Sequence, residues 1–176
     1  MYRRLVPTLA LLLTAAACSS SPPEAGASYF EDAAAISTGY ESVAAAHFAE
    51  YRTLLEAATA ETGDQIFVDA NKGLFESLAN DFGRAVTDLS ALTPPTDAVQ
   101  PHEAWVAAAG ALNDAFQSTD DQLAPLTEAP AVNAVVSTVP LADLQADYRA
   151  ACRAVAALAD GESIPAIACD PVSGGA

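Results

Sequence analysis

Two histidines are the side chains of this 176-residue chain best suited to acid–base or metal chemistry. His47 and His102 both fall on apolar positions of helical patterns, and Glu50 follows His47 by about one turn. If successive helices run in opposite directions, the first and third helices bring both histidines to the core near one end. His47, Glu50 and His102 would then supply the ligand types of a divalent transition metal. The alternative, favoured for a lone histidine on an apolar stripe, is a hydrogen-bonded core residue.

Other catalytic signatures are missing from the sequence. It contains no Gly-x-Ser-x-Gly motif and no glycine-rich phosphate loop, and its only lysine is Lys72. His102-Glu103 begins like a zinc-protease helix, but Val106 stands where the second histidine is required. An enzyme would need a carboxylate of raised pKa beside a histidine, which a sequence alone does not show. The sequence therefore favours a protein that is not an enzyme and that carries no cofactor.

The three cysteines divide into one near the start of the chain and two near its end. Cys152 and Cys169 are expected to form a disulfide if the chain is exported to an oxidising compartment. Closing such a loop stabilises a fold by about 3 kcal/mol in the chain-entropy model. Two free buried thiols are the alternative. Redox chemistry is disfavoured because no Cys-x-x-Cys spacing is present.

The first residues have the parts of a secretory signal. Two basic residues precede an apolar run over 5–17, which is too short to span a bilayer and ends in Ala15-Ala16-Ala17. Cys18 and the polar stretch after it resemble a bacterial lipobox, although Ala15 stands where leucine is usual. The resemblance implies a signal peptide at 1–17, acyl chains such as palmitate on Cys18, a tether at 18–27 and a domain at 28–176. An ordinary signal with an incidental Cys18 is the alternative.

The excess of acidic residues argues against binding to nucleic acids. It has 7 Lys and Arg against 23 Asp and Glu, a net charge of −16. Removal of a signal holding Arg3 and Arg4 would bring the net charge to −18. Phosphates would be repelled, and the acids are expected to be solvated on helix surfaces. An apolar content of 52% is too high for an intrinsically disordered chain.

Helical periodicity accounts for almost every long segment. The one β-like run, 65–68, is too short to build a sheet. We expect all-α structure: an antiparallel four-helix bundle whose C-terminal tail is held by the disulfide. The expected elements are a helix over 28–62 stopped by Gly63, a helix over 71–92 capped by Asp69 or Asn71, a helix from 96 or Pro101 to 123, a connection over 125–139 with a short helix at 132–136, and a helix over 141–158.

Four aromatic residues at helical spacing are expected to lie in the core: Phe82, Trp105, Phe116 and Tyr148. The functional alternative is that they line a pocket for an apolar ligand between the helices.

Two patterns resemble small Ala-rich lipoproteins of high-GC Gram-positive bacteria. One is Leu92-Thr93-Pro94-Pro95 with His102 ten residues after Leu92, and the other is Ala151-Cys152 followed by Cys169. The resemblance supports the helical fold. It transfers no functional residue, because the family has no established activity.

Together these patterns predict a lipoprotein anchored on the extracytoplasmic face of the cell membrane. We expect a non-enzymatic binding or interaction module, whose partners are the membrane, through its lipid, and an envelope protein. The alternative is a carrier or sensor that holds a small apolar ligand, a lipid or a divalent metal in the bundle core.

Overall fold

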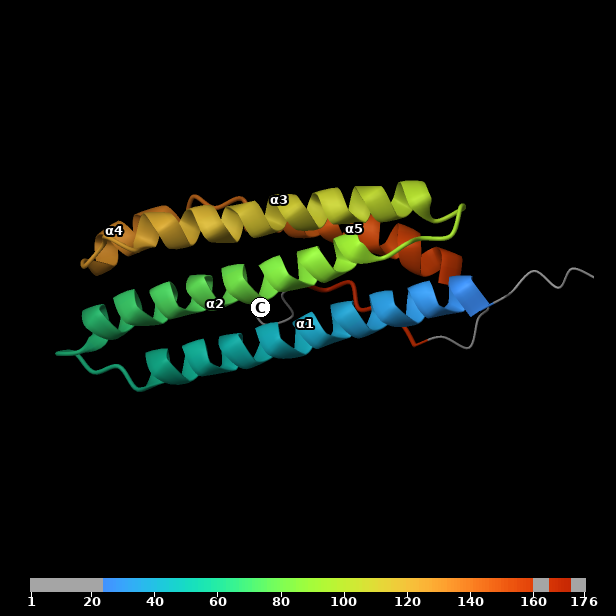
Figure 1. Cartoon of the computed structure of the whole chain (residues 1–176). Coiled ribbons are helices and arrows are strands. Elements are labelled where there is room, and N and C mark those ends of the chain that lie inside the picture. Colours follow the sequence, from blue (N-terminus) through green and yellow to red (C-terminus); the bar gives the residue numbers. More distant parts are fainter. Residues whose placement is uncertain (1–23, 160–164, 172–176) are drawn as a thin grey trace, which may run out of the picture.

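The computed structural model describes residues 24–159 and 165–171, and this part of the chain is all-helical (Figure 1). The long helices lie side by side in an elongated bundle, and the short α4 lies at the end where α2 begins and α3 ends. The all-α prediction is confirmed. The helices are α1 (Glu24–Glu56), α2 (Gly63–Ala91), α3 (Val99–Leu123), α4 (Ala129–Val136) and α5 (Leu141–Ala159).

Three helix pairs form the body of the bundle: α1 packs on α2, α2 on α3, and α3 on α5. The helix α4 rests on α2 and α3. Between α1 and α2, one hollow is lined by residues within 35–43 and 81–88, and another by residues within 47–54 and 69–77. Later positions of α1 therefore lie beside earlier positions of α2.

The connection between α1 and α2 differs from the prediction. The first helix ends at Glu56 and not near 62, and Gly63 begins α2 where a C-terminal stop of α1 was expected. Within the connection, the Thr59 N–H donates to Thr62 Oγ1 at 3.1 Å, and the two hydroxyl oxygens lie 3.0 Å apart. Hydroxyls that bond nearby backbone compete with helical hydrogen bonds, so the helix gives way to a turn here.

The second helix begins eight residues before Asn71, so both predicted caps lie inside it. The residue at the N-cap is Thr62. Gln65 Nε2 donates to Asp69 Oδ1 at 2.9 Å, a contact between neighbouring turns that stabilises the helix. The β-like run is helical because Val68 and Asn71 continue the buried face of α2.

Prolines stand near the starts of the next three helices. Pro101 lies in the first turn of α3, where its missing N–H costs no intrahelical bond. Pro130 occupies the first turn of α4, which is longer than the predicted 132–136. Pro140 directly precedes α5.

Aromatic side chains link three helices in the core. Phe82 of α2 and Phe116 of α3 are buried, with their ring centroids 5.8 Å apart. Tyr148 of α5 lies 5.6 Å from the Phe82 ring and 6.1 Å from the Trp105 ring. These contacts fix α5 against α2 and α3, in keeping with the preference of aromatic pairs for tilted or edge-on packing.

Candidate functional site

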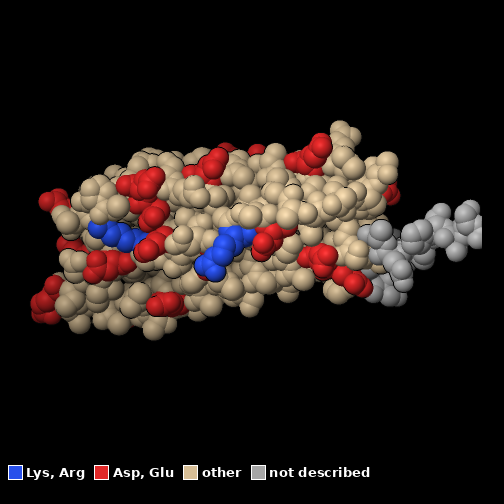
Figure 2. Space-filling model, viewed as in Figure 1, with Lys and Arg blue, Asp and Glu red and all other residues tan. Residues whose placement is uncertain are grey.

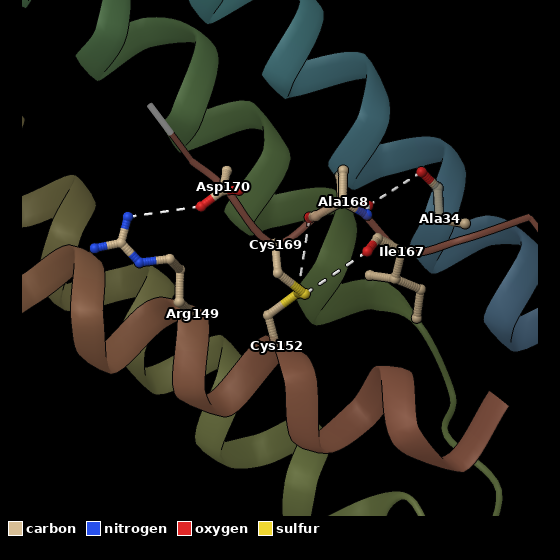
Figure 3. The surroundings of a disulfide bond; sticks show 8 residues. Ala34, Arg149, Cys152, Ile167, Ala168, Cys169 and Asp170 are labelled. Atoms are coloured by element: carbon tan, nitrogen blue, oxygen red, sulfur yellow. Dashed lines mark hydrogen bonds and ion pairs between the residues drawn. A yellow bond between two sulfur atoms is a disulfide. The ribbon is translucent and has the colours of Figure 1, made fainter. Parts of the chain in front are cut away.

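The predicted disulfide is present. Cys152 and Cys169 are bonded, with 5.6 Å between their Cα atoms and a sequence separation of 17. Cys152 is completely buried on α5. Figure 3 shows the tail passing between α1 and α5, with Cys169 turned towards Cys152. The bond therefore fixes a segment without regular secondary structure to the body of the bundle.

The tail segment, residues 165–171, also contacts both helices through polar groups. The Ala168 N–H donates to Ser37 Oγ of α1 at 3.1 Å, and that hydroxyl donates to Ala34 O at the same distance. On the α5 side, Arg149 forms an ion pair with Asp170, with 3.6 Å between Nη1 and Oδ1 (Figure 3). Since Pro171 is buried too, the tail segment is packed rather than merely tethered.

The space between α1 and α5 explains why the tail segment matters. Within the described residues, α1 does not pack closely on α5, unlike the other neighbouring long helices. The tail segment occupies the gap at the level of Ser37 and Cys152. It serves as the packing element that joins these two helices.

One predicted metal ligand, His102, is a buried core residue. Its Nδ1 lies 3.0 Å from the Tyr29 hydroxyl of α1, and the two rings meet edge-on. Burial lowers the pKa of His102, against the opposing effect of Glu103. Burial likewise raises the pKa of Tyr29 to about 12. The lowered pKa of His102 and the raised pKa of Tyr29 both favour the neutral forms. The Tyr29 hydroxyl then donates a hydrogen bond to Nδ1 of a neutral His102.

The other predicted ligands lie elsewhere. His47 Nε2 is 2.7 Å from Asp81 Oδ2 on α2, and Asp81 also pairs with Arg84 at 2.6 Å. His47 and Glu50 line one hollow, but Tyr29, the partner of His102, precedes His47 by 18 residues, about 27 Å along α1.

The structure therefore does not bring His47, Glu50 and His102 together. Nowhere in 24–159 or 165–171 do three His, Cys, Asp or Glu side chains form a group suited to a metal ion. The predicted register is wrong because it extends α1 to 62 and begins α2 too late.

The predicted aromatic pocket is largely filled by its own side chains. Phe82, Trp105 and Tyr148 line a void of about 10 Å³, and Phe116 lines a different cavity. Such a void has room for one water molecule and excludes an organic ligand. The four residues are thus core residues that share no single pocket.

Two described residues that line that small void carry buried polar atoms without a hydrogen-bond partner. Among the described residues, the Tyr40 hydroxyl and Trp105 Nε1 meet no hydrogen-bond partner, and both are buried. Burial raises the pKa of Tyr40 well above its usual range and that of Tyr148 to about 12, although the nearby Trp105 indole lowers the latter. Burial therefore favours the protonated form of both phenols.

A larger cavity shares only Phe116 with the predicted pocket. It measures about 190 Å³ and is lined by residues of α1, α2, α3, the end of α4 and the start of α5. The lining is almost entirely apolar: Phe48, Tyr51, Asn71, Leu74, Phe75, Leu78, Phe116, Val136, Leu141 and Gln145. Periodicity places each side chain on a helix face, but it cannot report how far apart two helices stand.

Acidic side chains are spread along the face of the bundle that Figure 2 shows. Figure 2 shows carboxylates scattered along the visible face, with the few basic side chains between them. This distribution fits the expected role of the acids as solvating groups. Asp120 is the one carboxyl in the described part whose pKa is clearly raised, by burial and by the nearby Glu76 and Asp121.

The predicted lipid site, Cys18, lies outside the described residues, as do the signal segment and most of the tether. In the part of the chain that is described, no helix is both long and apolar enough to cross a bilayer.

In comparisons with family models, curated proteins and solved structures, no match to this chain was found.

Proposed function

We propose that this chain is a lipid-anchored, extracytoplasmic binding or interaction module of the cell envelope that catalyses no reaction. Its body is an antiparallel four-helix bundle, and its anchor is an acylated Cys18. The observation that carries this proposal is the Cys152–Cys169 disulfide.

The disulfide supports a location outside the cytoplasm. Reducing thiol systems keep such bonds from persisting in the cytosol, whereas exported proteins retain them. This bond also has a structural task, because it holds the tail segment between α1 and α5. A fold that depends on an oxidised cysteine pair suits an exported chain, and the lipobox-like start of the sequence is in agreement.

An antiparallel bundle is supported by the order of contacts between α1 and α2. Residues near the middle of α1 meet 81–88, and residues nearer its end meet 69–77. The connection between Glu56 and Gly63 is short, and short connections typically join neighbouring helices that run in opposite directions. In this arrangement the tail segment completes the bundle where α1 and α5 would otherwise meet.

The formal net charge of −16 on the full chain favours a protein partner over nucleic acid. The two histidines form hydrogen bonds between helices, His102 with Tyr29 and His47 with Asp81, which is a structural role. We therefore propose an envelope protein as the macromolecular partner of the anchored module.

The anchor is tested by labelling. A bacterium that processes lipoproteins and expresses the full chain is fed an alkyne-bearing fatty acid, and membranes are separated from soluble fractions. The chain is expected to carry the label and to sediment with membranes. Cys18→Ser should remove the label and release the chain. The matched control, Cys169→Ser, should keep both. A labelled Cys18→Ser chain, or an unlabelled original chain, contradicts the proposal.

A further inference from the structure

The cavity between α1 and α5 has a buried floor and a partly open rim. Leu78 and Phe116 are at most 2% exposed and form the floor with other buried residues of α2. The rim consists of half-buried side chains from three helices: Phe48 and Tyr51 of α1, Val136 of α4, and Leu141 and Gln145 of α5. The opening therefore leads from solvent directly to the hydrophobic core.

The architecture explains why this space is not closed. The tail segment separates α1 from α5 at the level of Ser37 and Cys152. Phe48 lies 11 residues beyond Ser37, about 16 Å farther along α1, where the described tail contributes no lining residue. With α1 and α5 held apart and only the end of α4 between them, the apolar side chains cannot meet.

The size and lining of the cavity define what fits. Its volume of about 190 Å³ exceeds the roughly 150 Å³ of a well-known engineered apolar cavity that binds benzene. No charged side chain lines it. One buried polar group is present, the Asn71 carboxamide, which is oriented by a 2.8 Å hydrogen bond from Nδ2 to Phe67 O. A charged ligand would lose its hydration here without compensation.

We propose that this cavity binds a compact, uncharged, apolar molecule about the size of a substituted benzene, with at most one hydrogen-bonding group. The ring lies on Leu74, Leu78 and Phe116, and a polar substituent points towards Asn71 or the rim at Gln145. This assigns a ligand class to the binding module proposed above and rests on that role, but not on the lipid at Cys18.

Two other hollows of the described residues are less suitable. The void beside Trp105 holds about 10 Å³, too little for a ring. A groove of about 550 Å³ beside Leu92, Val99 and Val106 is wide and open to solvent, so it would bury little of a small ligand.

Toluene is the test probe, added to the full chain with its disulfide intact. Methyl groups of leucine and valine are followed by two-dimensional ¹H–¹³C NMR during the titration. Saturable shifts are expected at Leu74, Leu78, Val136 and Leu141, with half-saturation at about 1 mM or below. Shifts that never saturate overturn the proposal, and so do shifts confined to Leu92, Val99 and Val106.

A matched pair of variants tests the location. Val136→Phe fills the rim of the cavity and is expected to weaken toluene binding at least about tenfold. Val106→Phe makes the same change at a half-buried valine in the open groove, and it should leave binding within about twofold. If Val136→Phe no longer unfolds cooperatively, Gln145→Trp blocks the opening from α5. Unchanged binding in the folded blocked variant refutes the site.

The outcomes separate the two proposals. A lipidated chain that does not bind toluene contradicts only the cavity proposal. A chain that binds toluene but carries no fatty acid contradicts only the proposed anchor.

Discussion

The two halves of the seam between α1 and α5 are built differently. In the half that we call the locked half, Ser37, Cys152 and the tail segment connect α1 to α5, and Tyr29 joins α1 to His102 of α3. In the other, the open half, Phe48 and Leu141 face a cavity of about 190 Å³. The gap between the two helices is thus filled where the tail segment lies in it, and it leaves a ligand-sized space where no third segment fills it.

The largest effect on stability is expected from removing the disulfide that holds the tail segment. Replacing Cys152 and Cys169 together by Ser removes a cross-link between residues 17 apart in sequence. The free energy of unfolding should fall by about 3 kcal/mol, because the unfolded chain regains the entropy of an open loop. Urea unfolding of the oxidised chain, the reduced chain and the double variant measures this loss. A loss below about 1 kcal/mol would show that the tail segment does not lock the seam.

The buried histidine of the locked half should make stability depend on pH. Burial lowers the pKa of His102 in the folded chain, so the unfolded chain binds that proton first. Stability is then complete above about pH 6.5 and decreases as the pH falls below it, by at most about 1.4 kcal/mol per pH unit. His102→Gln should remove this part of the slope between pH 7.5 and 5. Equal slopes in unfolding experiments on both chains would contradict the buried neutral histidine.

A single hydroxyl should distinguish the two halves more finely. Ser37→Ala removes the acceptor of the Ala168 N–H and is expected to cost about 1 kcal/mol. Gln145→Ala, at the rim of the open half, should change stability by less than about 0.5 kcal/mol. Denaturant midpoints measure both variants. Equal costs would mean that the halves are held equally tightly.

The smallest effect concerns the end of the bundle near α4. Burial, with Glu76 and Asp121 nearby, raises the pKa of Asp120, so its charge opposes folding at neutral pH. Asp120→Asn should therefore stabilise the chain at pH 7, by less than about 1 kcal/mol. The gain should disappear as the pH falls through about 4, where the original carboxyl becomes neutral. Asp114→Asn, at an exposed position of the same helix, is the control in thermal unfolding and should show no comparable gain.

The sequence predicts the helical class and the disulfide well, for physical reasons that are local or chemical. Apolar spacing marks helix faces whatever their neighbours, and Cys152 and Cys169 are the pair left once Cys18 is assigned to lipid. Boundaries are harder. Gly63 is equally able to end one helix or to begin the next, and the outcome depends on hydroxyl contacts between Thr59 and Thr62.

Features that depend on distances between helices could not be predicted. Ending α1 six residues too late and beginning α2 eight residues too late was enough to place His47 beside His102, whereas the structure pairs them with Asp81 and Tyr29. The cavity depends on the tail segment holding α1 away from α5, a contact between residues 131 apart in sequence. No local pattern encodes that separation.

The most direct test is hydrogen exchange of the full chain with the disulfide oxidised and then reduced. We predict that reduction accelerates amide exchange at 30–40, 148–155 and 167–170, the locked half, and leaves 68–78 and 116–123 nearly unchanged. This result would show that the disulfide-bound tail segment alone joins α1 to α5. Uniform acceleration, or none at 30–40, would contradict the division of the seam into a locked and an open half.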